Sequence, residues 1–174
     1  MNRRFVIEAV MIAIYGQLLH PKHPVEYRIP YSTVMELYEM RVSSEPIMPE
    51  ANDDYYVKSM MGEMIQFFED PFNKKKLERA LIAPWRESPP MPINDHVTFV
   101  VVNTIENAQY GELLDPVETD VVLLSLRSQC PILTDQIDFQ EKVIQNSVPV
   151  QLFDIEDFEF ALEHKVTTPD GHSQ

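Results

Sequence analysis

The carboxylate of Asp135 stands where the chain leaves a buried strand, a position at which many α/β proteins bind ligands. The apolar pair Ile132–Leu133 ends in Thr134 and Asp135, and an amphipathic segment starts at once. In open parallel sheets, ligands bind just outside the carboxyl ends of the strands. Asp135 is therefore a candidate site residue. The alternative is that Asp135 caps the next helix, with Asp138 in the first turn of that helix.

Three other acids stand near the start of predicted elements. Glu8 follows the β-prone run 5–7, Glu36 lies on a helix expected over 31–40, and Asp120 lies in the first turn of a later helix. Two of them also have a purely structural interpretation. Glu36 falls off the apolar stripe of its helix and can be a solvated surface acid. Asp120 can simply complement the helix dipole.

Buried strands alternate with amphipathic helices along the chain. The clearest strand is Val97–Val102, which is apolar almost throughout, as is typical of a strand inside a parallel sheet. Further strands are expected at 5–7, at Ile132–Leu133 and at 148–153, with a short extended piece at 25–29. Helices are expected at 9–19, 31–40, 52–69, 73–82, 115–129, around 139–143 and at 154–163. This alternation predicts an α/β fold, a three-layer sandwich with a mainly parallel central sheet.

Two of these helices have clear start signals. Asp115, Pro116 and Glu118 form the pattern of a capping acid, a proline at the first helical position and an acid three positions on. Asn73 is the expected cap of the short helix over 73–82.

Length and composition indicate one acidic domain. The 174 residues are expected to form a single domain over 1–165 with a disordered tail at 166–174. Lysine and arginine number 14 against 28 acids, so the net charge is −14, and such a surface repels nucleic-acid backbones. The single cysteine, Cys130, fits a cytoplasmic protein. The N-terminal apolar run is interrupted by Glu8 and is too short for a membrane span, so we expect no membrane association.

One dense basic cluster stands out against this acidity. It consists of Lys74, Lys75, Lys76 and Arg79 on the helix expected over 73–82. It is either an ordinary solvated helix face or the region that contacts the phosphates of a nucleic acid.

The order of the four acids resembles the PIN-domain family. Residues 6–9 read Val-Ile-Glu-Ala, where the family has an acid closing its first strand. Residues 30–37, Pro-Tyr-Ser-Thr-Val-Met-Glu-Leu, resemble the helix that carries the family's second acid. Residues 120–126 and 134–139, Asp-Val-Val-Leu-Leu-Ser-Leu and Thr-Asp-Gln-Ile-Asp-Phe, are similar to the third and fourth motifs. The resemblance spans most of the chain, but residues 42–115 contain no motif.

The resemblance implies a metal-dependent endoribonuclease. Glu8, Glu36 and Asp120 would be the catalytic, metal-ligating carboxylates, with Asp135 as a fourth. Carboxylate oxygens suit Mg²⁺ or Mn²⁺, which activate water and neutralise charge on a phosphodiester.

Two departures from the family pattern support a second hypothesis. Glu8 stands where the family has Asp, and Gln136 stands where it has an acid. The longer side chain moves the carboxylate, and the amide removes a negative charge, so both changes weaken a metal site. The second hypothesis is a decayed PIN-like domain that serves as a protein-interaction or regulatory module, with another protein or a second copy of itself as partner.

Overall fold

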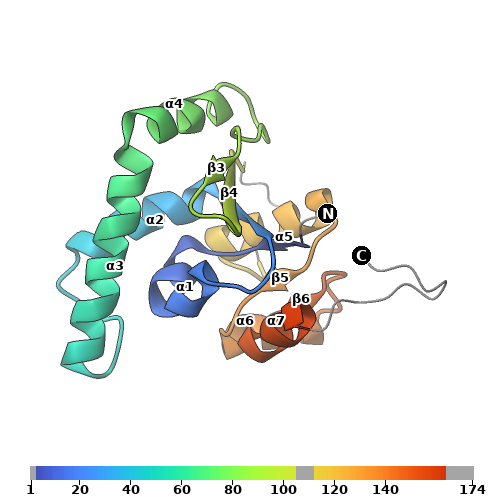
Figure 1. Cartoon of the computed structure of the whole chain (residues 1–174). Helices are drawn as coiled ribbons and strands as arrows, with labels where there is room; N and C mark the ends of the chain where they lie inside the picture. The colour runs from blue at the N-terminus through green and yellow to red at the C-terminus, as the bar shows by residue number, and fades with distance from the viewer. Residues whose placement is uncertain (1–2, 105–111, 164–174) are drawn as a thin grey trace.

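The computed structural model describes residues 3–104 and 112–163, and its centre is one mixed six-stranded sheet (Figure 1). The strand order is β3-β4-β2-β1-β5-β6. The strands are β1 (Arg3–Val6), β2 (Val25–Pro30), β3 (Met91–Pro92), β4 (Val97–Val102), β5 (Ile132–Leu133) and β6 (Leu152–Phe153). All neighbouring pairs are parallel except β3 with β4.

The parallel strands wind outward from β1 in two directions. From β1 the chain steps to β2 and then to β4 on one side, and it later returns to β5 and β6 on the other. The direction therefore reverses between β1 and β5. In open α/β sheets, this switch point leaves a crevice outside the carboxyl ends of the two strands. The elements thus place the segments after Val6 and after Leu133 side by side.

Helices cover both faces of the sheet. They are α1 (Ala9–Ile14), α2 (Tyr31–Val42), α3 (Ala51–Glu69), α4 (Pro71–Ala80), α5 (Pro116–Ser128), α6 (Ile137–Gln145) and α7 (Ile155–Glu163), with a 3-10 turn at Gly16–Leu19. Alternate strand residues face opposite layers, because side chains along a strand point to alternate sides. Phe5 packs in the core beneath α1, α3 and α7, whereas Val6 packs in the core beneath α5 and α6. The expected three-layer α/β sandwich with a mainly parallel sheet is confirmed.

Some elements differ from expectation. Residues 25–30, expected as a minor extended piece, form the central strand β2, which pairs with both β1 and β4. The expected strand over 148–153 is reduced to Leu152–Phe153. A short antiparallel strand, β3, lies in the proline-rich connector, where no strand was expected. The tail expected at 166–174 lies outside the described residues.

The helix starts are partly as expected. The Asp115 side chain accepts a hydrogen bond from the Glu118 backbone, and the Glu118 side chain accepts one from the Asp115 backbone, so the capping box of α5 is confirmed. The expected Asn73 cap is wrong, because α4 begins two residues earlier and the Asp70 carboxylate caps it. Asn73 instead donates to the Phe67 carbonyl.

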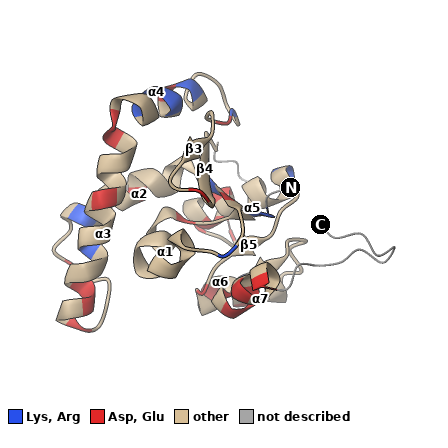
Figure 2. Ribbon diagram, viewed as in Figure 1, with Lys and Arg blue, Asp and Glu red and all other residues tan. Residues whose placement is uncertain are grey.

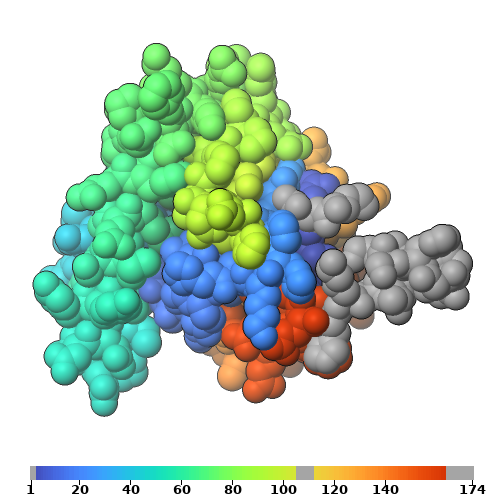
Figure 3. Space-filling model, viewed as in Figure 1, coloured from blue at the N-terminus to red at the C-terminus, as the bar shows by residue number. Residues whose placement is uncertain are grey.

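Helices α3 and α4 form one flank of the molecule, away from α6 and α7 (Figure 3). The inner face of α3 buries Val57, Met61, Met64 and Phe68 against the core, as their helical spacing predicts. In the described part of the chain, no helix is both long and apolar enough to cross a membrane.

Candidate acidic site at the sheet edge

Glu8 lies at the switch point, two residues beyond β1 and directly before α1. Its position is set by the sheet, because Val6 pairs with Ile132 of β5 on one side and with Arg28 of β2 on the other. The Ile7 backbone N–H then donates to the Arg28 carbonyl. The Glu8 side chain is half-buried and reaches the segment after β5.

Burial and like charges together raise the pKa of Glu8 from 4.5 to about 7. Burial is the largest cause, since it disfavours the charged carboxylate. The negative charges of Glu36, Asp115, Glu118 and Asp135 add to it. The structure therefore places carboxylates of α2, of the N-terminus of α5 and of the segment after β5 within electrostatic reach of Glu8. Glu8 is about half protonated at neutral pH.

Thr33 connects the segment that carries Glu8 to the helix that carries Glu36. Its hydroxyl Oγ1 accepts a hydrogen bond from the Ala9 backbone at 3.2 Å and donates to the Pro30 carbonyl at 2.9 Å. This buried link ties the first residue of α1 to the end of β2. Glu36, one turn further along α2, has its pKa raised by burial and by the charges of Asp115 and Glu39.

Asp135 belongs to the site and does not cap the next helix. Helix α6 begins at Ile137 with Gln136 at the N-cap position. The Asp135 carboxylate instead accepts a hydrogen bond from the hydroxyl of Tyr15, at the end of α1. Burial raises the pKa of Asp135. The capping alternative for Asp135 is therefore wrong. Nothing in the sequence pointed to Tyr15.

Gln136 makes a direct contact within the site. Its side-chain amide Nε2 donates a hydrogen bond of 2.9 Å to Glu8 Oε2. The Gln136 backbone N–H donates to Thr134 Oγ1 at 3.2 Å, which fixes the turn between β5 and α6. An uncharged donor therefore stands beside Glu8 where the family pattern has a second acid.

Asp115 and Glu118 are acids that the sequence assigned only to helix capping. Their charges also act on Glu8, because the N-terminus of α5 lies beside the switch point. Glu118 is partly neutralised by Lys142 of α6, whose Nζ lies 2.9 Å from Glu118 Oε1. The sequence showed that these two acids form a capping box, but it did not show that the box would lie close to Glu8.

Asp120 lies one turn further into α5 and is buried, with 4% of its surface exposed. The charges that raise the pKa of Glu8 come from other acids of the site. Of the four acids expected as ligands, Glu36 and Asp135 act on Glu8 through their charges, and Asp120 is buried in the helix that covers this end of the sheet.

The donors suit a hard divalent cation in their chemistry, since they are carboxylate oxygens in a region where several negative charges lie near Glu8. Within residues 3–104 and 112–163, no three His, Cys, Asp or Glu side chains are grouped closely enough to hold a metal ion. A cation would therefore have to draw these side chains together.

The basic cluster lies on α4, in the part of the molecule where Lys and Arg gather (Figure 2). Two of its members contact nearby groups: Lys74 pairs with Glu69 at 3.6 Å, and Lys76 donates to the Pro90 carbonyl at 2.8 Å. Lys75 and Arg79 are exposed. The helix packs through Leu77 and Ala80, so the charges lie on its outer side.

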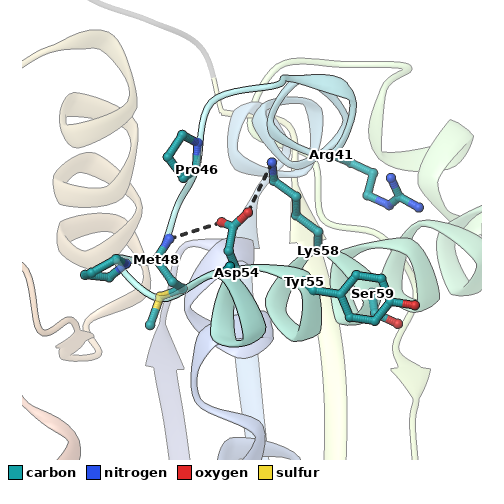
Figure 4. A pocket seen from close by; sticks show the side chains of 9 residues that line it. Arg41, Pro46, Met48, Asp54, Tyr55, Lys58 and Ser59 are labelled. Atoms are coloured by element: carbon teal, nitrogen blue, oxygen red, sulfur yellow. Dashed lines mark hydrogen bonds and ion pairs between the residues drawn. The ribbon is translucent and has the colours of Figure 1, made fainter.

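A hollow of about 500 Å³ lies between the loop 43–50 and α3, away from the acidic site (Figure 4). Asp54 spans it by accepting hydrogen bonds from the Ile47 and Met48 backbones and by pairing with Lys58 at 3.4 Å. Lys58 also donates to the Ser43 carbonyl. These contacts hold the loop against the helix, so we assign the hollow a structural role.

Fold and site define an α/β protein with a doubly wound, mainly parallel sheet and a group of acidic residues at its switch point. No known protein family and no curated protein matches this chain.

Proposed function

We propose that this chain is a PIN-like endoribonuclease that depends on Mg²⁺ or Mn²⁺. The observation that carries the proposal is the gathering of Glu36, Asp135 and the acids of α5 around Glu8, with the resulting rise in the pKa of Glu8. Strongly shifted carboxylates in a crevice are typical of functional sites. The parallel strand order, with its switch point between β1 and β5, supports the resemblance that the four motifs suggest.

The chain's own residues would hold the cation and prepare the site. Glu8, Glu36, Asp120 and Asp135 would provide the oxygen ligands. A bound cation would supply an activated water and neutralise charge on the phosphodiester. Tyr15 orients the Asp135 carboxylate through its hydroxyl, and Thr33 holds the start of α1 against the end of β2. Because Glu8 is partly protonated at neutral pH, cation binding would release a proton from it.

The second candidate is the decayed PIN-like module, and the Gln136 contact favours it. The side-chain amide of Gln136 donates a hydrogen bond to Glu8 Oε2. This bond stabilises the half-buried carboxylate in the absence of a metal ion, as an inactive site would require. In that case the domain would act through a protein partner or a second copy of itself. The lone Cys130 supports a reducing compartment such as the cytoplasm in either case.

Two measurements, thermal melting with Mn²⁺ and an RNA-cleavage assay, distinguish the nuclease from the decayed module. On the nuclease proposal, a cation that binds only the folded chain stabilises it by about 2.7 kcal/mol at a hundredfold excess over Kd. For a domain of this size, that is a rise in Tm of roughly 5–11 °C with millimolar Mn²⁺. Glu36→Gln and Asp135→Asn should remove most of this rise and abolish cleavage of single-stranded RNA.

The matched control is Glu141→Gln, an exposed acid on α6, which should leave both the Mn²⁺ response and the cleavage unchanged. If neither Mn²⁺ nor Mg²⁺ changes the Tm of the wild type, the nuclease proposal fails and the decayed module is favoured.

A further inference from the structure

A second hollow of about 410 Å³ lies between the sheet and α5, and its lining is rich in arginine. We call it the arginine pocket. The side chains that bear on its chemistry are Arg4, Arg28, Arg127, Ser128, Trp85 and Glu87. Three of the chain's few cations therefore gather at one place in a protein with a net charge of −14. Its volume falls in the range of sites for small molecules.

Arg28 is the buried cation of the arginine pocket. Only 3% of its surface is exposed, although it carries a permanent charge. Its Nε donates to Ser128 Oγ at 2.9 Å, and its Nη1 lies 3.0 Å from Glu26 Oε2. Its Nη2 lies 2.8 Å from Glu87 Oε2. A buried guanidinium is stabilised by anionic partners, and Arg28 has two, Glu26 and Glu87. A negative group at the place of the Glu87 carboxylate would preserve the second of these pairs.

Glu87 occupies that place from the solvent side. Its side chain is 56% exposed, unlike that of Arg28. Its backbone is fixed, because Glu87 bridges to Val102 and the next residue, Ser88, donates to the Val101 carbonyl at 2.7 Å. The carboxylate can therefore swing outward while the segment stays in place. We interpret it as an internal substitute for the oxyanion of a ligand, since carboxylate and phosphate make the same paired contacts with arginine.

Trp85 forms the wall of the pocket opposite the sheet. Its φ is 59°, in the left-handed region that large side chains rarely adopt. Hydrogen bonds hold it there: its backbone N–H donates to the Asn103 carbonyl at 2.7 Å, and the Asn103 N–H donates to the Arg86 carbonyl at 2.9 Å. The Arg127 guanidinium lies over the indole, 4.4 Å from its centre. Such enforced conformations concentrate at ligand-binding segments.

The charges of the pocket select the ligand. Glu26 pairs with both Arg4 and Arg28, at 3.2 and 3.0 Å, and remains inside. With Glu87 turned outward, three arginines and Glu26 leave a charge of 3 − 1 = +2. A phosphate dianion balances that charge, whereas one carboxylate balances only half of it. We propose that the arginine pocket binds the phosphate group of a small molecule, which displaces Glu87 from Arg28. This proposal is independent of the acidic site.

Trp85 makes the proposal directly measurable, because it is the only tryptophan in the chain. Inorganic phosphate, adenosine monophosphate and the monoanion acetate are titrated separately into the full chain in EDTA at pH 8 and constant ionic strength. At this pH a phosphate monoester is a dianion. Both phosphates should give a saturable change in indole fluorescence and a rise in Tm. Tighter binding of the nucleotide would identify an organic phosphate, and equal binding would identify phosphate alone.

Three variants test the assignment. Arg4→Gln should weaken phosphate binding about tenfold, the effect of one charge-assisted hydrogen bond. Glu87→Gln removes the internal competitor and should tighten binding several-fold, which a surface site for anions would not show. The control Arg86→Gln, an exposed residue outside the lining, should leave the affinity unchanged. The proposal is overturned if wild type and Glu87→Gln both fail to saturate at 10 mM phosphate, or if acetate binds as tightly as phosphate.

Discussion

At the scale of single residues, the surroundings of Glu8 change its pKa strongly. Its carboxylate is half-buried, accepts one hydrogen bond from Gln136 and lies in the field of four other acids. In the unfolded chain the same carboxylate titrates near its ordinary pKa of 4.5. The folded chain therefore binds a proton more tightly at this position than the unfolded chain does.

This difference predicts that stability depends on pH through Glu8. Between about pH 4.5 and 7 the folded state holds the extra proton, so the free energy of unfolding falls as pH rises through this window. The full contribution is on the order of 3 kcal/mol, present below pH 4.5 and lost above about pH 7. Urea unfolding in EDTA from pH 5 to 8 measures it. Glu8→Gln should remove this part of the pH dependence; a constant difference between the variant and wild type would contradict the assignment.

Gln136 allows a test of the missing charge. Gln136→Asp removes the donor to Glu8 Oε2 and adds a carboxylate at the same place. Without a cation, like charges should raise the pKa of Glu8 further. With millimolar Mn²⁺, the Tm rise should exceed that of wild type, because the site gains a hard oxygen ligand. Thermal melts with and without Mn²⁺ measure both effects. Gln136→Ala is the control: it removes the donor without adding charge and should not increase the Mn²⁺ response.

At the scale of elements, the N-terminus of α5 combines capping with charge. Asp115 and Glu118 satisfy each other's backbone N–H groups, and both carboxylates also act on Glu8. Neighbouring elements fix the rest of the site: β1 leads into Glu8, α2 carries Glu36, and β5 ends just before Asp135. The ends of helices and strands therefore position the acids, three of which lie in the short segments that join these elements.

Two substitutions at Asp115 separate capping from charge. Asp115→Ala should cost about 1 kcal/mol through loss of the cap. That is a fall in Tm of roughly 2–4 °C for a domain of this length. Asp115→Asn keeps a good cap, so its Tm should stay close to that of wild type. Both changes should lower the pKa of Glu8, measurable by NMR titration of its side chain. Equal Tm losses in the two variants would show that the carboxylate acts through its charge alone.

At the scale of the whole molecule, charge is distributed unevenly. The net charge is −14, the acids meet at the switch point, and the cations concentrate on α4 and in the arginine pocket. Any RNA that approaches the acidic site must therefore be held by basic side chains elsewhere on the surface.

If the domain binds RNA, α4 should provide phosphate contacts. Replacing Lys74, Lys75, Lys76 and Arg79 together by Ala should weaken binding to single-stranded RNA and flatten its dependence on salt. Each lost phosphate contact makes the negative slope of log K against log salt shallower by about 0.7. Filter binding from 50 to 300 mM salt measures both quantities. Replacing the exposed Lys22 and Arg86 is the control, and an unchanged slope in the α4 variant would exclude the cluster from binding.

The sequence alone determined the fold class and two of the main elements. The apolar run Val97–Val102 had to be a buried strand, and the pattern Asp115, Pro116 and Glu118 had to start a helix, because these signals depend only on neighbouring residues. Asp135 was predicted as a site residue from a local pattern, and Glu8 and Glu36 were predicted from the resemblance of their segments to family motifs.

The tertiary structure decided what local patterns do not contain. Residues 25–30 became the central strand because β1 and β4 pair with both of their edges, and that pairing depends on distant segments. The hydroxyl of Tyr15 on Asp135, the amide of Gln136 on Glu8 and the charges of α5 on Glu8 all cross between elements. The arginine pocket likewise brings together Arg4, Arg28 and Arg127, which are far apart in the sequence. Nothing in the sequence indicated that these three charges would meet around the buried ion pair of Arg28 and Glu87. Contacts of this kind are set by packing and register, which only the folded chain defines.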